Sequence, residues 1–206
     1  MHVALAVLGF VIVEAAFLST PFIVNIGLSM AQGMTWLLVL GAFMFATNAL
    51  ENWAIRSQDK QKQYLALTLY VVAQAFIFVP LMYMAIAMTG DLSVISQAGT
   101  VTLFLFSGLT AVVFLSGKDF SFLRSAITVG GFIAMGLIVA GMLFGFSLGL
   151  WFSVAMVILA AGSILYQTSN IIKGYHKDQY VAASLGLFSS LMLMFWYVLS
   201  FFMSQD

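Results

Sequence analysis

The sequence predicts an all-α integral membrane protein, and three observations carry that prediction. Hydrophobic residues make up 63% of the 206 residues and charged residues only 7%, whereas a soluble domain carries about 25% charged residues. Apolar segments of about 20 residues, long enough to cross a hydrocarbon core of roughly 30 Å, recur along the whole chain. Lysines and arginines gather in alternate loops. Together these features predict a single bundle of seven transmembrane helices with no separate soluble domain.

Seven apolar segments account for most of the chain. They are Val3–Val24, Met34–Trp53, Tyr64–Met88, Ala98–Ser116, Ala126–Phe146, Leu150–Ile172 and Tyr180–Met203. The basic residues fall in the second, fourth and sixth loops between these segments; they are Arg56, Lys60, Lys62, Lys118, Arg124, Lys173 and Lys177. Basic loops stay in the cytoplasm. We therefore expect a cytoplasmic amino terminus and a Ser204–Asp206 tail on the outer side.

Several residues within or beside these segments predict local structure. Pro80 lies inside the third segment and Pro21 near the outer end of the first, so each is expected to kink its helix, and Pro80 is also a candidate hinge. The fifth segment carries small residues at four-residue spacing, which suggests a central helix closely packed by others; they are Ala126, Gly130 and Ala134. Asp119, just before that segment, is expected to cap the start of its helix.

Glu14 stands near the middle of the first segment, where an ionised carboxylate is expensive. The residue must be protonated, paired or open to water, and no basic residue lies at a comparable depth. Two interpretations remain open. Glu14 is either a protonated acid hydrogen-bonded to a neighbouring helix or a group that senses or relays protons.

Polar side chains also lie toward the inner ends of three other segments. Asn48, Glu51 and Asn52 share one face of the second helix by their spacing, and they could meet Gln74 of the third segment and Gln167 and Asn170 of the sixth. Such a cluster is either structural, since interhelical hydrogen bonds stabilise membrane bundles, or the inner vestibule of an ion or proton path. Spacing alone does not separate these two interpretations.

Three sequence stretches resemble the Bax inhibitor-1 (TMBIM) family, and most of all its bacterial YccA-like branch. ILYQTSNIIKGYHKDQYVAASLGLF resembles the hairpin between the sixth and seventh helices, KDFSFL the stretch entering the fifth helix, and SQAGTVTLFLF the start of the fourth. The resemblance is clear from about Gln97 to Phe202. It implies a seven-helix bundle in a bacterial inner membrane.

The resemblance also implies an activity and shows where this chain departs from it. Family members are proposed to leak calcium or protons, with a pair of carboxylates as pH sensor, and the matching positions here are Gln167 and Ser190. Neither side chain ionises in the usable range, so the shared-proton mechanism cannot operate through them. Val79 and Arg124–Ser125 replace family glycines.

Two functions follow as hypotheses. The first is a passive calcium or proton pathway, altered at the acidic pair, in which Glu14 and Glu51 are the remaining acids. The second is a non-transporting protein that binds and modulates a membrane quality-control protease of the FtsH type. No enzyme activity, cofactor, metal site or nucleic-acid partner is expected, because the chain has no cysteine and its two histidines, His2 and His176, lie at a membrane edge and in a loop.

Overall fold

The computed structural model describes residues 1–57, 59–174 and 179–204, and the regular structure in these ranges is helical. His176, Lys177 and the end of the predicted outer tail lie outside the described residues. The helices are α1 (His2–Leu18), α2 (Pro21–Met30), α3 (Gly33–Arg56), α4 (Lys60–Thr89), α5 (Ser93–Ser116), α6 (Leu123–Phe144), α7 (Gly149–Lys173) and α8 (Tyr180–Met203).

Six of the helices, α3 to α8, are long and apolar enough to cross a membrane, and they correspond to the second to seventh predicted segments. The pair α1 and α2 meets the same test only when taken together, which gives up to seven spans. The predicted class, an all-α membrane protein, is confirmed.

The first predicted segment, Val3–Val24, is not one continuous helix, because it breaks between α1 and α2 with a bend of 96°. Pro21 is the first residue of α2, and Thr20 before it is extended, with φ −107° and ψ 100°. A residue preceding proline is pushed out of the helical region by a steric clash. The hydroxyls of Ser19 and Thr20 each donate to the carbonyl of Ala16 at 2.8 Å, which satisfies the end of α1. Pro21 therefore produces a break where the sequence predicted a kink.

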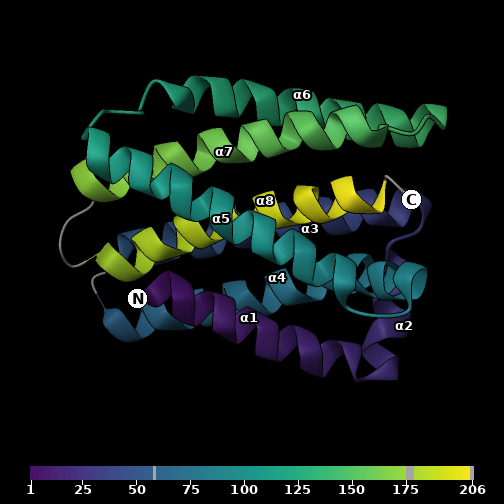
Figure 1. Cartoon of the computed structure of the whole chain (residues 1–206). Coiled ribbons are helices and arrows are strands. Elements are labelled where there is room, and N and C mark those ends of the chain that lie inside the picture. The colour runs from purple at the N-terminus through teal and green to yellow at the C-terminus, as the bar shows by residue number, and fades with distance from the viewer. Residues whose placement is uncertain (58, 175–178, 205–206) are drawn as a thin grey trace. The chain divides into compact units, whose positions relative to one another are not determined.

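Tertiary contacts divide the described residues into two compact units, and α8 contributes to both. The first unit holds α1 to α4 and the part of α8 up to Phe188. Within it α1 lies along α4 (Figure 1), and Phe10 meets Phe78 edge to face with ring centroids 5.2 Å apart. Tyr70 of α4 meets Phe188 of α8 in the same way at 6.2 Å. Aromatic pairs of this kind hold α4 between α1 and α8 within this unit.

The second unit contains α5, α6, α7 and the rest of α8, and α7 packs against both α5 and α6. Gly130 of α6 faces the side chain of Leu159, and Gly162 of α7 faces Ile127. Only 11% of the most apolar stretch of α6 is buried, against 67% for α4 and 61% for α8. The prediction of a central fifth helix was therefore wrong: its small residues let α6 approach one neighbour, α7, and α4 and α8 are the buried helices.

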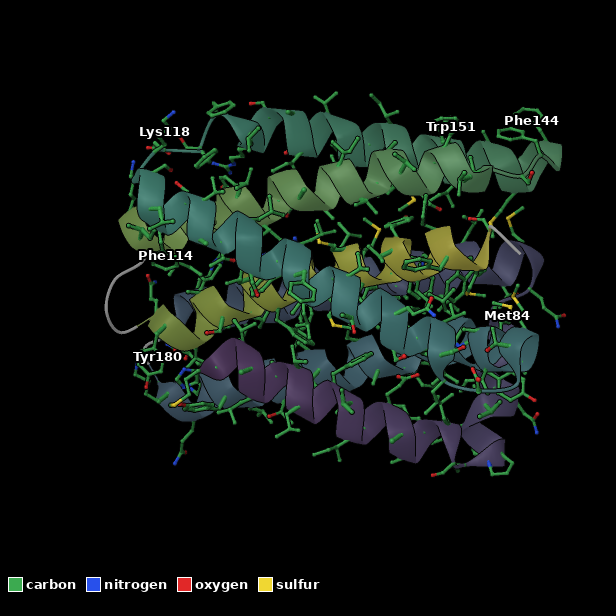
Figure 2. The ribbon with its side chains drawn as sticks, in the orientation of Figure 1. Met84, Phe114, Lys118, Phe144, Trp151 and Tyr180 are labelled. Atoms are coloured by element: carbon green, nitrogen blue, oxygen red, sulfur yellow. The ribbon has the colours of Figure 1, made fainter. Side chains whose placement is uncertain are left out.

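Large apolar side chains cover the outer faces of the helices, as expected for surfaces in contact with lipid. At the junction of α6 and α7, Phe144 and Trp151 extend outward (Figure 2) and are 80% and 81% exposed. Lys118 lies at the other end of α6, beside Gly117, whose left-handed φ of 60° ends α5. An aromatic side chain at one end and a basic one at the other are typical of the two membrane interfaces.

Helix α4 continues through Pro80, which is buried inside it, and α2 approaches it closely there. A Cβ placed on Gly27 of α2 would lie 3.0 Å from Cγ1 of Val79 and 3.5 Å from Cδ of Pro80. Val79 is β-branched and has essentially one rotamer in a helix, so it cannot turn away. Gly27 is thus required for this contact, and the role of Pro80 as a hinge stays a prediction.

The substitution Gly27→Ala is expected to lower the free energy of unfolding by about 1–3 kcal/mol through overpacking against Val79. Trimming the opposite side chain with Val79→Ala should restore stability in the double variant. Gly41→Ala is the matched control, because nothing lies within 4 Å of a Cβ at Gly41. Thermal unfolding in detergent measures all four proteins, and an equal effect of Gly27→Ala and Gly41→Ala would contradict the close contact.

Candidate functional site

Two of the stretches that resemble the Bax inhibitor-1 family meet in the second unit. The amide of Phe120, in the KDFSFL loop, donates to Oγ of Ser169 on α7 at 3.1 Å. One turn further along α7, Nζ of Lys173 lies 3.8 Å from Oδ2 of Asp119. The loop between α5 and α6 is therefore attached to the end of α7 that leads into the hairpin.

The sequence predicted that Asp119 caps the start of α6, but the structure shows no direct cap by its side chain. Helix α6 begins at Leu123, and Oδ1 of Asp119 accepts instead from the amide of Ser121 at 2.8 Å. This backbone hydrogen bond, with a second from the Ser121 side chain and the charge of Lys173, lowers the pKa of the Asp119 carboxyl from its ordinary value of 3.8. A lowered pKa means that this interaction stabilises the fold above pH 3.8 and is lost as the pH falls through the folded-state pKa.

Ser190, just after the stretch that resembles the family hairpin, lies in a hydroxyl pair. Oγ of Ser190 on α8 lies 2.8 Å from Oγ of Ser163 on α7, and Ser190 is buried. Gln167 lies one helical turn beyond Ser163, so their side chains share a face of α7. Helices α7 and α8 thus meet here in a hydrogen-bonded, uncharged contact.

The neighbouring polar residues of α7 differ in their surroundings. Gln167 and Asn170 are half-buried, and Thr168 is buried with no hydrogen-bond partner for its hydroxyl among the described residues. Buried hydroxyls without a partner are uncommon in membrane helices, where the i−4 carbonyl usually accepts. The last turns of α7 therefore contain a hydroxyl, that of Thr168, which makes no hydrogen bond with the described residues.

Glu14 is buried in the first unit. It follows Ala6 and Phe10 on one face of α1 at four-residue spacing, and all three are buried. Phe10 contacts Phe78 of α4, so this face of α1 turns toward α4. Among the described residues neither carboxylate oxygen of Glu14 has a hydrogen-bond partner. A carboxyl group in that condition must either be reached by water or carry a proton.

The other polar residues of the first unit that the sequence singled out differ in burial. Gln74 of α4 is buried, whereas Asn48 and Asn52 of α3 are exposed and Glu51 is half-buried. Nδ2 of Asn52 donates to both the backbone oxygen of Asn48, at 2.9 Å, and its Oδ1, at 2.8 Å. Gln167, Asn170 and Ser190 belong to the second unit, so the meeting of all these side chains in one cluster stays a prediction.

A polar cluster that sequence reasoning missed lies where α1, α4 and α8 begin. Nε2 of His2 lies 2.9 Å from the Tyr64 hydroxyl, the His2 ring lies 4.8 Å from the Tyr180 ring, and Nζ of Lys60 lies 4.0 Å over that ring. The signal for this cluster was two tyrosines, each opening an apolar segment, because tyrosine favours the membrane interface.

No group of three or more metal-ligating side chains occurs within the ranges that the structure describes. The site residues are instead amides, hydroxyls and single carboxylates distributed over apolar helices. Fold and site together define a polytopic membrane protein with an uncharged polar contact between its last two helices.

Comparisons with known proteins give the family. The family described as Inhibitor of apoptosis-promoting Bax1 matches residues 1–206, and the chain belongs to it. An uncharacterized protein of Pseudomonas aeruginosa is 36% identical over 124 residues, 60% of this chain and 55% of that protein. The modulator of FtsH protease YccA of Escherichia coli is 32% identical over 120 residues, 57% and 53% of the two chains.

A further relative, an uncharacterized membrane protein of Vibrio cholerae, is 30% identical over 122 residues, 59% of this chain and 54% of that protein. The chain spans about half the length of the curated relatives it matches. Another Escherichia coli relative is named as the inner membrane protein YccA. These names and the six apolar helices confirm the expected multi-pass protein of a bacterial inner membrane.

Removing the Ser169 hydroxyl is expected to release the KDFSFL loop from α7. Ser169→Ala takes away the acceptor of the Phe120 amide, which should lower the free energy of unfolding by about 1 kcal/mol and speed hydrogen exchange at that amide. Ser184→Ala is the control, because the Ser184 hydroxyl donates to the Tyr180 carbonyl within α8. Unchanged exchange at Phe120 in the Ser169 variant would show that the loop is held by other contacts.

Proposed function

We propose that this protein modulates a membrane-bound quality-control protease of the FtsH type by binding it within the bilayer, without transporting an ion. The relative named as a modulator of FtsH protease supports this assignment, at 32% identity over 120 residues. The uncharged contact between α7 and α8 supports it as well, because Gln167 and the Ser163–Ser190 pair offer no carboxylate to a calcium ion.

The observation that carries the proposal is the exposed asparagine pair on α3. Asn48 and Asn52 are exposed, and only 6% of the most apolar stretch of α3 is buried. Facing hydrocarbon, a side-chain amide costs several kcal/mol unless it is hydrogen-bonded. Two asparagines can make more hydrogen bonds than the two that Asn52 donates to Asn48.

A transmembrane helix of the protease is the partner that this surface fits. Asparagines promote association of membrane helices because they exchange hydrogen bonds across the contact. The pair lies on a helix that already carries large exposed apolar side chains, among them Met44 and Phe45, which would pack around the polar centre. Such an interface needs neither a soluble domain nor a titrating residue in this chain.

Replacing both asparagines tests this interface. In cells that overproduce the protein, degradation of a membrane reporter by the protease should slow, and the protease should co-purify. The variant with Asn48→Leu and Asn52→Leu should lose both effects, with binding at least about tenfold weaker if each interhelical hydrogen bond contributes about 1 kcal/mol. Phe132→Leu, a change of an exposed side chain on α6, is the control. Normal reporter turnover in a deletion strain, together with no co-purification, would refute the proposal.

Glu14 favours a second candidate function, a passive proton or calcium pathway. Its two buried carboxylate oxygens have no partner among the described residues. A water chain reaching that carboxyl would satisfy both oxygens and provide a route for protons. Pro80, by removing one helical amide from α4, also leaves the carbonyl of Phe76 available to water or an ion.

Flux measurements separate the two candidates. Proteoliposomes loaded with a pH or calcium dye should show flux above empty liposomes if the pathway exists, and Glu14→Gln should reduce proton flux to the level of empty liposomes. Asp91→Asn, at an exposed position just before α5, is the control. Restoring an acid with Gln167→Glu should then increase the pH sensitivity of any remaining flux. Absence of flux in the wild-type protein from mildly acidic to mildly alkaline pH would eliminate this candidate.

A further inference from the structure

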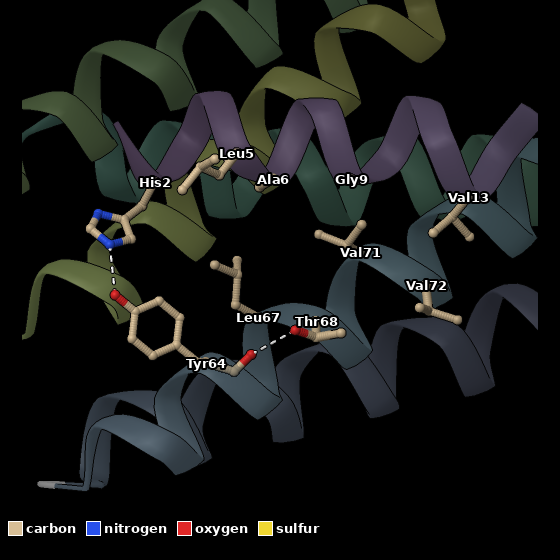
Figure 3. Close-up of a pocket in the computed structure, with 10 residues that line it drawn as sticks. All are labelled: His2, Leu5, Ala6, Gly9, Val13, Tyr64, Leu67, Thr68, Val71 and Val72. Atoms are coloured by element: carbon tan, nitrogen blue, oxygen red, sulfur yellow. Dashed lines mark hydrogen bonds between the residues drawn. The ribbon is translucent and has the colours of Figure 1, made fainter.

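A cavity of about 240 Å³ lies between α1 and α4 in the first unit, and its two ends differ in polarity. Figure 3 shows His2 and Tyr64 at one end, joined by their hydrogen bond. The rest of the lining is apolar apart from Thr68, whose hydroxyl is bonded back to the Tyr64 carbonyl. Gly9 lies in the α1 wall, and Val71 and Val72 lie opposite on α4.

A lysine lies close to the polar end of the cavity. Nζ of Lys60 is held over the Tyr180 ring, and that ring lies beside His2. Tyr64 and Tyr180 are each 41% exposed, and half-exposed tyrosines mark the membrane interface.

The apolar end runs into the hydrocarbon. From His2 to Val13 the cavity wall on α1 spans 12 residues, which is about 16 Å along a helix. Leu5 and Val72, both in the lining, are 55% and 37% exposed, so the cavity opens to the bilayer and is not enclosed. An open apolar trough beside a membrane helix accommodates part of an acyl chain.

We propose that this groove binds an anionic phospholipid, with the phosphate at Lys60 and His2 and one acyl chain between α1 and α4. A lysine with a histidine at one end and an apolar trough at the other match the two parts of such a lipid, and neither a free anion nor a neutral lipid matches both. The predicted orientation of the chain places Lys60 at the cytoplasmic leaflet, where basic pockets between helices recognise acidic headgroups.

Lipid retention by the full chain in detergent tests the proposal, with dioleoyl phosphatidylglycerol and dioleoyl phosphatidylcholine as probes. Native mass spectrometry should show phosphatidylglycerol retained in preference, and that lipid should raise the unfolding temperature more than phosphatidylcholine does. Lys60→Gln should weaken phosphatidylglycerol binding about fivefold. Lys118→Gln, a change of the same charge in the second unit, should leave it unchanged.

The groove itself is tested at Gly9. A Cβ at this position would meet Val71 Cγ1 at 3.6 Å, an ordinary contact, so Gly9→Ala should retain the lipid. Gly9→Leu should fill the trough and abolish retention. Equal retention of the two lipids by the wild-type protein would overturn the proposal, as would an equal stabilisation by glycerol phosphate, which has no acyl chain. Both of these comparisons use the wild-type protein, so they test the proposal even if the Gly9→Leu variant does not fold.

Discussion

The fold depends on one constraint: in hydrocarbon, each backbone amide and carbonyl must find its hydrogen bond inside the protein. Continuous helices meet this requirement, and the interruptions are placed where other groups can meet it. At the break between α1 and α2, two side-chain hydroxyls bind the Ala16 carbonyl. Pro80, which removes one amide from α4, lies in a buried part of that helix, where protein groups and not lipid surround the carbonyl that it leaves unpaired.

The same constraint explains why composition predicted the class and the segments corresponding to α3 to α8, and why finer features were harder to predict. The length of an apolar segment can be read from that segment alone, without knowing its neighbours. The size of the bend at Pro21 depended on the backbone angles of the residues beside it, which the sequence pattern does not give. The small residues of α6 were expected to mark a central helix, but they mark a close contact with one neighbour, α7. Ser190 could not be paired from sequence, because a lone serine can equally bond within its own helix, as Ser184 does.

The polar residues of the candidate site could be predicted from the sequence, but whether each side chain is buried or exposed was harder to predict. Spacing placed Asn48 and Asn52 on one side of their helix, but the structure shows that this side is exposed. Glu14, in contrast, is buried toward α4. Hydrogen bonding within a helix follows from separation along the chain, whereas the partner across a contact depends on rotations that the sequence pattern does not encode. The polar groups thus divide into one acid turned inward and an amide pair turned outward, which are suited to different tasks.

The approach of α2 to α4 has a consequence for how the sequence can vary. The family resemblance leads one to expect a glycine before Pro80, but this chain has Val79 there. The glycine of this contact lies instead on the opposite helix, at Gly27. One of the two facing positions must carry a small residue for the backbones to come so close, but it can lie on either helix. The two positions should therefore covary: relatives that retain glycine before the proline are free to carry a larger residue opposite it, and an evolutionary path between the two arrangements passes most easily through a chain with glycine at both.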